Sequence, residues 1–233
     1  MDYFPVHITQ MPQDPVTHQT MTMLELLEYF RKNISPTFTQ GNSTTFSPYF
    51  DGAYLLGQPV VYVDDHNLFN SDDVNSLGAW GHFHISLDDG SIVESDYEKS
   101  ASDNYFIFTT MATKKDDTHP VAGNRRFGIK TSSQGGYEFY ISGVDRIWKF
   151  YASIINNNFI SNYFDQHIAF DAADALWEQV QTNMINFVNQ NGGSASYFAP
   201  QHKSARVKWQ GAIKDFLNGT KTLQQLKAAL NCP

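Results

Sequence analysis

The sequence has a single cysteine, Cys232, one place before the last residue. A lone cysteine forms no internal disulfide, and we assign this one no catalytic role. No apolar run approaches the roughly 20 residues that a membrane span requires. The first residues also lack the basic and apolar regions of a secretory signal. We therefore expect synthesis in the cytoplasm and, if the protein is exported, a route that needs no cleavable signal.

Charged residues are also few, at 17% of the chain, and the formal net charge is −8. An acidic protein is repelled by phosphate backbones, which argues against a nucleic-acid partner. The short signatures of serine hydrolases, zinc peptidases, phosphate-binding loops and dithiol redox proteins are all missing from the chain. We therefore expect no cofactor.

Aromatic residues, in contrast, are abundant, at 15% of the chain, with 18 Phe and 12 Tyr. Each ring buries a large area, so a few of them can organise a core. The same rings also suit an apolar cavity or a recognition surface. If the protein holds a small apolar ligand, the candidate ligand-binding residues are Trp80, Phe108, Phe127 and Tyr140.

Helical spacing appears near the N-terminus and again in the last third of the chain. Residues 1–20 contain three prolines and little periodicity, which predicts an extended arm. Thr22 and Glu25 then form a capping-box pattern at the start of a helix, and Thr222 and Gln225 form a similar pattern at the start of the last one. A single apolar stripe from Ala173 to Val188 predicts the longest helix. The predicted helices cover about 22–33, 147–155, 171–190, 209–217 and 222–230.

The middle of the chain predicts short strands separated by tight turns. Asp89 and Gly90 lie between two β-rich runs, which is a strong hairpin signal. Nothing in this region indicates alternating strands and helices, so the sheet is predicted to be antiparallel. The predicted strands cover about 54–63, 80–85, 91–97, 105–111, 121–131 and 137–144.

These elements predict an α+β fold, in which a curved antiparallel sheet over about 54–144 packs against the N-terminal and C-terminal helices. A helix-grip-like arrangement, in which the sheet wraps a long helix, satisfies both apolar faces. A small β-barrel with helical appendages is the alternative. We expect one α+β domain over 1–195, which includes the arm, and a C-terminal helical appendage over 196–233 packed on the same domain.

The densest group of candidate catalytic residues lies between 117 and 146, where three of the five arginines occur. His119, Arg125, Arg126, Asp145 and Arg146 could form an anion site, because the guanidinium fork suits carboxylate or phosphate. The alternative is a structural network in which Asp145 and Glu138 neutralise the arginines across neighbouring strands.

Side-chain alternation along the strand over 121–131 separates its two arginines. Arg125 shares a face with Phe127 and Ile129, which makes that face the apolar one. Arg125 is then the buried arginine, and a buried guanidinium requires a charged partner. We expect Asp145 or Glu138 to be that partner, while Arg126 points to the opposite side.

The same region carries a resemblance. The pattern His-Pro-Val-x-Gly-Asn-Arg-x-Phe-Gly at 119–128, followed by Phe-Tyr-x-x-Gly-Val-Asp-Arg at 139–146, resembles a pattern in uncharacterised bacterial proteins. Some of these resemble cargo or accessory parts of toxin-delivery systems. The resemblance implies a bacterial, delivered or secretion-linked protein, and it transfers no catalytic residue.

His82 and His84 are the candidate metal ligands, because residues i and i+2 of a strand point to the same face. Asp88 and His119 are possible further ligands, but no recognised metal-motif spacing is present. Two histidines on a solvated sheet face are the simpler interpretation, so we expect no metal.

Three functions remain open. The first is a non-catalytic binding or interaction protein, such as a bacterial effector, cargo or accessory protein, whose partner is another protein or a small apolar ligand. The second is a hydrolase or nuclease-like toxin that uses His119 and the arginine cluster. The third is a structural component of a larger assembly.

Overall fold

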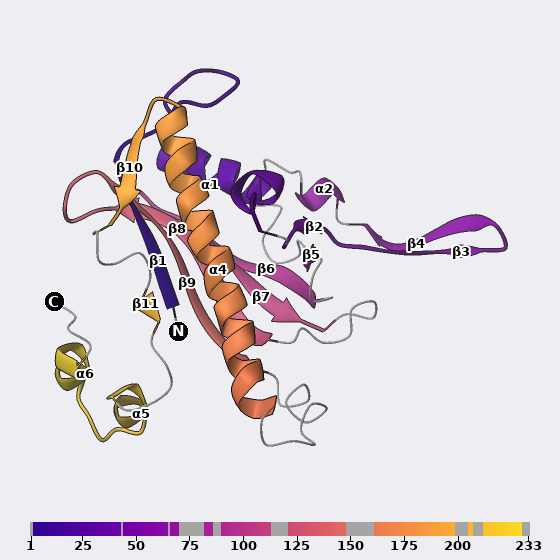
Figure 1. Ribbon diagram of the computed structural model, residues 1–233. Coiled ribbons are helices and arrows are strands. Elements are labelled where there is room, and N and C mark those ends of the chain that lie inside the picture. Colours follow the sequence, from indigo (N-terminus) through magenta and orange to yellow (C-terminus); the bar gives the residue numbers. More distant parts are fainter. Residues whose placement is uncertain are drawn as a thin grey trace.

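The first strand of the chain lies inside its main sheet. Among the residues that the structure describes, the sheet has nine strands, and every pairing in it is antiparallel. Eight strands follow the order β10-β1-β9-β8-β7-β6-β5-β2, and β11 pairs with β1 beyond β10 (Figure 1). The computed structural model describes residues 2–42, 44–64, 66–69, 82–85, 90–112, 121–147, 161–198, 205–206 and 212–229.

The strands of this sheet come from both ends of the chain as well as its middle. Their bounds are Asp2–Gln10 (β1), Phe46–Pro48 (β2), His82–Ile85 (β5), Gly90–Lys99 (β6), Asp103–Met111 (β7), Val121–Thr131 (β8), Tyr137–Ile147 (β9), Ser194–Tyr197 (β10) and Ala205–Arg206 (β11). The predicted α+β class and the antiparallel pairing are therefore confirmed. In the described part of the chain the sheet stays open, with β10 and β2 at opposite ends, so the barrel alternative is not supported.

The prediction of an extended arm over residues 1–20 is wrong for its first half, because Asp2–Gln10 is the strand β1 between β9 and β10. Proline is usually excluded from inner strands because it lacks an N–H. Pro5 is tolerated because it lies between the residues that pair with β11 and those that pair with β10. The buried Gln181 side chain donates to the Pro5 carbonyl at 2.6 Å at this gap.

The middle strands follow the prediction closely. The strand β8 has the predicted bounds, β9 extends three residues beyond the predicted 144, and the predicted hairpin around Gly90 joins β5 to β6. The region 54–63 differs, because it is two strands rather than one. Phe50–Leu55 (β3) and Gln58–Asp64 (β4) form a separate two-stranded hairpin. Residues 54–144 therefore do not form one sheet as predicted.

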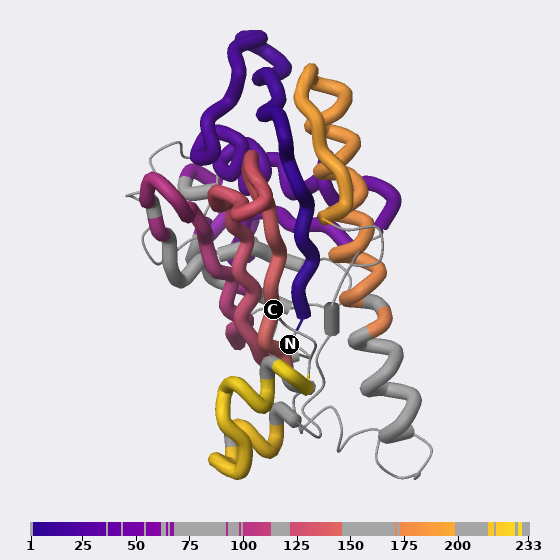
Figure 2. The backbone as a smooth tube through the Cα atoms, turned by 90° about the vertical axis from the view of Figure 1, so that its left-hand side faces the viewer, coloured from indigo at the N-terminus to yellow at the C-terminus, as the bar shows by residue number. Residues whose placement is uncertain are grey.

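The helices of the described residues are Met23–Lys32 (α1), His66–Phe69 (α2), Ser161–Gln190 (α4), Ala212–Leu217 (α5) and Leu223–Ala229 (α6), with a π-helical turn at Ile34–Phe38 (η1). Two of them, α1 and α4, lie on one face of the main sheet. The long helix α4 crosses the sheet and contacts β1 and β10 (Figure 1). Turned by 90°, the magenta to pink strands and the orange α4 form separate layers (Figure 2).

The predicted capping boxes are confirmed, whereas the long helix α4 begins at Ser161, ten residues before the predicted start at 171. Thr22 and Glu25 form a complete capping box at the start of α1, and Thr222 and Gln225 do the same for α6. The predicted stripe of α4 is buried from Trp177 onward. The helix predicted over 147–155 begins with the last residue of β9 and otherwise lies outside the described residues.

The core between sheet and helices is built from aromatic rings. Phe30 of α1 packs against Phe127 and Phe139 at ring-centroid distances of 5.5 and 5.0 Å. Phe106 packs against Phe127 at 5.0 Å, and Phe38 of η1 packs against Phe30 at 4.9 Å. All five side chains have no accessible surface. The abundance of Phe is thus used to fill this core.

None of the helices among the described residues combines the length and the apolar character needed to cross a membrane.

Candidate functional site

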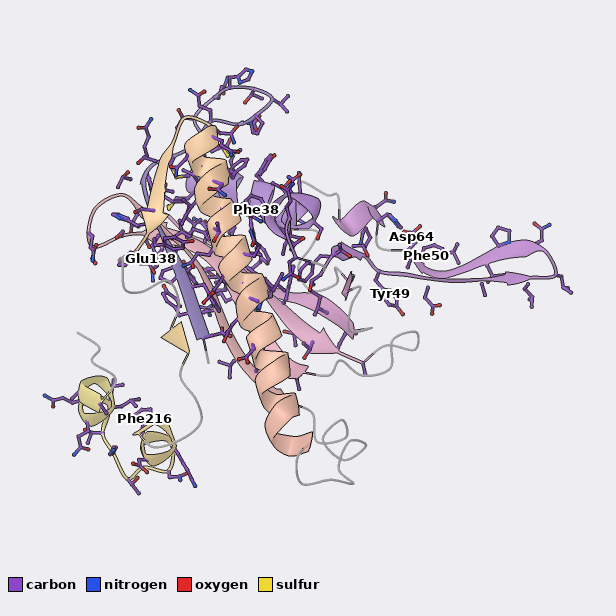
Figure 3. All side chains as sticks on the ribbon, in the orientation of Figure 1. Phe38, Tyr49, Phe50, Asp64, Glu138 and Phe216 are labelled. Carbon is purple, nitrogen blue, oxygen red and sulfur yellow. The ribbon has the colours of Figure 1, made fainter. Side chains whose placement is uncertain are left out.

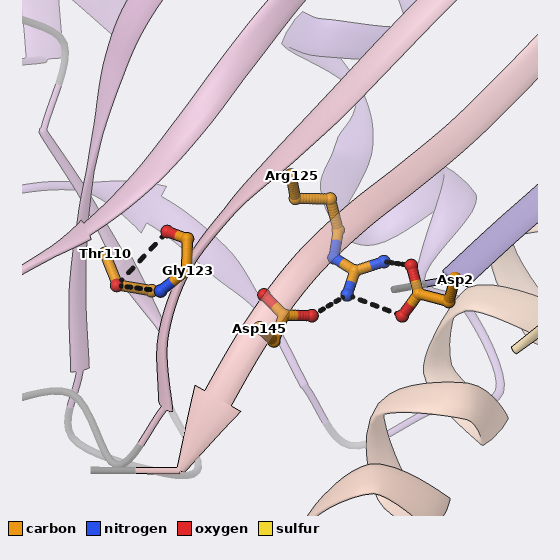
Figure 4. Close-up of polar contacts among 5 residues, drawn as sticks. All are labelled: Asp2, Thr110, Gly123, Arg125 and Asp145. Carbon is orange, nitrogen blue, oxygen red and sulfur yellow. Dashed lines mark hydrogen bonds and ion pairs between the residues drawn. The ribbon is translucent and has the colours of Figure 1, made fainter. Parts of the chain in front are cut away.

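Arg125 lies on the inner face of the sheet, which is the face that α1 and α4 cover. Its guanidinium donates to both carboxylate oxygens of Asp2, at 2.9 and 3.0 Å. It also forms an ion pair with Asp145 (Figure 4). The predicted burial of Arg125 and its predicted pairing with Asp145 are therefore confirmed. The second carboxylate, Asp2, was not predicted because it lies 123 residues away in the sequence.

Two glycines make room for this ion pair. An added Cβ at Gly143 would lie 2.5 Å from the Arg125 Nη2 atom, and one at Gly123 would lie 2.3 Å from Asp145 Oδ1. The Thr110 hydroxyl accepts from the Gly123 N–H at 2.9 Å and continues the β7–β8 pairing by one residue. These glycines of the 119–146 pattern therefore allow side chains to approach the backbone closely.

The helix α4 covers the guanidinium from the other side. The Arg125 Cζ atom lies 4.7 Å from the centroid of the Trp177 ring, a distance at which a cation is attracted to the face of an indole. Burial raises the pKa of Asp145 above its ordinary value, and the positive charge of Arg125 opposes this rise only in part. The ion pair is thus enclosed between the sheet and α4, as the alternative of a structural network predicts.

Arg126 lies on the opposite, outer face, as alternation predicts. Its guanidinium stacks over the Tyr105 ring at 4.0 Å. On the same face, Lys130 bonds to the Tyr3 hydroxyl at 3.1 Å and pairs with Glu138 at 3.1 Å. We call this group the outer-face cluster; its members are Tyr3, Asp103, Tyr105, Arg126, Lys130, Glu138 and Tyr140.

Two tyrosines connect the outer-face cluster across four neighbouring strands. The Tyr3 and Tyr140 rings stack at 5.8 Å, the Tyr3 hydroxyl donates to Glu138, and the Tyr140 hydroxyl donates to Asp103 at 3.1 Å. Burial and these carboxylates raise the pKa of both hydroxyls well above the ordinary value. Neither tyrosine is therefore prepared to lose a proton near neutral pH, which argues against a role as a general base.

The candidate catalytic residues are not brought together by the fold. The sheet separates Arg125 from Arg126, and Glu138 pairs with Lys130 on the outer face rather than with an arginine. Arg146 belongs to β9, but its side chain is outside the described residues, as is the whole of His119.

The candidate ligand-binding residues are likewise divided. Phe108 and Phe127 lie against each other in the core at 5.0 Å. Tyr140 is paired with Gly128 on the outer face, where an added Cβ at Gly128 would lie 2.4 Å from its ring. Trp80 lies outside the described residues.

For the candidate metal ligands, only the strand is described. His82 and His84 both belong to β5, but their side chains are outside the described residues, as are the whole of Asp88 and His119. Within the described part of the chain, no group of three potential metal-ligating side chains occurs.

The most exposed apolar side chains of the described chain include several on the β3–β4 hairpin, which extends away from the body (Figure 1). Leu56 is 97% exposed, Leu55 64% and Val61 53%. Phe50, at the base of the hairpin beside Asp64 (Figure 3), is 40% exposed. None of the twelve residues from Gly52 to Val63 carries a charge. Apolar surface gathered on one projecting element is typical of an interaction site.

The tip of the hairpin is also strained. Leu56 and Gly57 form a two-residue loop, and both have positive φ, at 52° and 77°. This backbone conformation suits Asn, Asp or Gly and is unfavourable for leucine. A strained residue that is almost entirely exposed gains no packing energy within its own chain, and such strain often marks functional sites. Sequence reasoning missed this site because leucine is not a turn residue.

Comparison of the chain with protein-family models, with curated proteins and with solved structures found no match.

Proposed function

We propose that this protein is a non-catalytic interaction protein that docks its β3–β4 hairpin against another protein chain. The single observation that carries the proposal is the exposed hairpin, uncharged from Gly52 to Val63, with the strained Leu56 at its tip. A two-stranded hairpin alone is marginally stable in water, and a further contact stabilises it. The hairpin then gains that contact from the partner.

The partner is a protein rather than a small apolar ligand. The rings that would hold such a ligand, including Phe108 and Phe127, pack against one another in the core. We propose a helix-grip-like scaffold in which α4 and α1 close the inner face. Its role is to hold the hairpin in place. The resemblance of residues 119–146 to delivery-linked bacterial proteins fits a protein that works through docking.

A lipid surface is a poorer partner for the hairpin. Membrane-binding elements combine apolar side chains with lysine or arginine that meet anionic headgroups. No lysine or arginine occurs between residues 44 and 64, and the chain as a whole has a formal charge of −8. The hairpin begins and ends near Asp51 and Asp64, which anionic lipid would repel.

Replacing Leu56 with aspartate tests this function. Aspartate tolerates the left-handed backbone at this position, so the fold is retained, but its charge cannot be buried in an apolar contact. We expect the parent protein in extracts of its natural host to elute from a sizing column as a complex, and the Leu56→Asp variant to elute as a single chain.

Val16→Asp is the matched control, because Val16 is 84% exposed and lies outside the hairpin. It makes the same change in charge and is expected to elute with the parent. Identical elution of the parent and both variants would contradict the proposed function.

A further inference from the structure

The register of the β3–β4 hairpin determines which backbone groups face outward. Leu55 and Gln58 flank the two-residue loop and form its closing pair. In such a hairpin the closing residues bond to each other, and the pairs then alternate along the strands. Ala53 and Val60 therefore also bond to each other, while Gly52 and Tyr54 direct their N–H and C=O groups away from β4.

The two outer edges of the hairpin are not equivalent. Pro59 is paired with Tyr54, so its nitrogen lies on the outward side of β4 and carries no hydrogen to donate. The outward side of β3 has a complete set of donors and acceptors at Gly52 and Tyr54. Among the strands that the structure describes, β3 pairs only with β4. A free edge whose outward backbone groups belong to the uncharged Gly52 and Tyr54 is a template for another strand.

We propose that the strand that completes this edge is β3 of a second copy of the protein. This inference rests on the proposed function and names its partner. Antiparallel pairing about a two-fold axis at Ala53 places Gly52 opposite the partner's Tyr54, and Tyr54 opposite the partner's Gly52. These are the residues whose backbone groups face outward, so both pairs are hydrogen-bonded. The product is a four-stranded sheet with the order β4-β3-β3-β4.

The side chains of β3 are complementary to themselves in this register. Phe50 comes beside the partner's Leu56, so the exposed apolar residue at the base of one hairpin meets the exposed apolar tip of the other. Asp51 comes opposite the partner's Leu55, which keeps the two Asp51 carboxylates apart. A two-fold contact requires such self-complementarity, because each patch meets its own copy.

Charge favours an interface built on the hairpin over one built on the body. Two copies with a formal charge of −8 repel each other at close range. The six residues of β3 extend about 20 Å at 3.4 Å per residue. That distance exceeds the screening length of about 8 Å at physiological salt, so the paired hairpins hold the acidic bodies where their repulsion is weak.

A cysteine at position 53 tests the register directly. Ala53 lies on the two-fold axis in a pair that is not hydrogen-bonded, where Cα atoms are about 4.5 Å apart. That separation lies in the range of natural disulfides. In a Cys232→Ser background, which removes the only native thiol, Ala53→Cys is expected to form a disulfide-linked dimer under mild oxidation.

Two control cysteines measure the background rate of disulfide cross-linking between copies of the protein. Val16→Cys is exposed but outside the hairpin. Leu55→Cys is inside it, but its symmetry mate lies about 14 Å away, four residues along the strand. We expect Ala53→Cys to cross-link at least ten times faster than either control, and the untreated parent to show the mass of two chains in sedimentation equilibrium. Circular dichroism verifies that each variant is folded.

The outcomes separate this inference from the proposed function. A parent that remains a single chain at all concentrations overturns the second copy as partner. A dimer in which Ala53→Cys reacts no faster than Val16→Cys overturns it as well, because the contact then lies elsewhere. In either case the proposed function still stands if Leu56 contacts a different protein in the host, and fails if Leu56 contacts none.

Discussion

Replacing Arg125 with methionine is expected to lower the free energy of unfolding by about 3–5 kcal/mol, the usual cost of removing one partner from a buried ion pair. Arg125 is 7% exposed and holds Asp2, which is 3% exposed, through two hydrogen bonds. Methionine fills much of the same volume but leaves both Asp2 and Asp145 without the guanidinium. Urea unfolding followed by circular dichroism measures the loss.

Arg126→Met is the first control for this prediction. Arg126 is half-buried on the outer face, where it stacks on Tyr105. We expect a loss of about 1 kcal/mol, typical of a cation–π contact at a partly exposed site. Equal losses for the two variants would show that the Arg125 ion pair has no special part in stability.

Asp145→Asn is the second control, and its stability relative to the parent is expected to depend on pH. The folded protein raises the pKa of Asp145 above its ordinary value of 3.8. Between that value and the raised one, the folded state therefore holds a proton that the unfolded state has lost. The stability of the parent relative to Asp145→Asn is then greatest below pH 3.8 and falls as the pH rises through this interval. If the stability of the parent relative to Asp145→Asn instead grew with pH, the pKa of Asp145 would be lowered in the folded protein rather than raised.

Replacing Trp177 with alanine is the second change expected to be costly, at about 3–5 kcal/mol. The Trp177 ring is buried and packs against Phe127 at 5.4 Å and Phe46 at 6.1 Å. It also covers the Arg125 guanidinium, so the variant loses a cation–π contact in addition to apolar burial. The same unfolding measurement applies.

The coupling between Trp177 and Arg125 can be measured with the double variant. Because the two side chains are in contact, the losses of Trp177→Ala and Arg125→Met are not expected to add. A melting temperature of Trp177→Ala within a degree of the parent would mean that this helix does not pack on the sheet as described.

The local features of the fold were predictable from the sequence because they depend on neighbouring residues. Capping boxes at Thr22 and Thr222 place two helix starts, and alternation along β8 separates Arg125 from Arg126. The apolar stripe that contains Trp177 identifies the buried side of α4. Each of these signals lies within a few residues of the structure that it predicts.

The features that the sequence did not predict depend on pairing between strands far apart in the chain, or on a residue in a position that usually excludes its type. Proline at position 5 argues against an inner strand, yet the gap between β10 and β11 accommodates it. Asp2 reaches Arg125 only after β1 has paired with β9. Leu56 carries no turn signal, so the break between β3 and β4 was not predicted, nor was the projecting hairpin.

The most direct test of the central claim is photo-cross-linking from the tip of the hairpin. A photoreactive side chain in place of Leu56 in the host's own cells is expected to give covalent adducts to a protein chain, identified by mass spectrometry. The same side chain in place of Val16, which is similarly exposed, is expected to give none. Adducts from both positions in equal yield, or from neither, would contradict the account of the hairpin as the docking element.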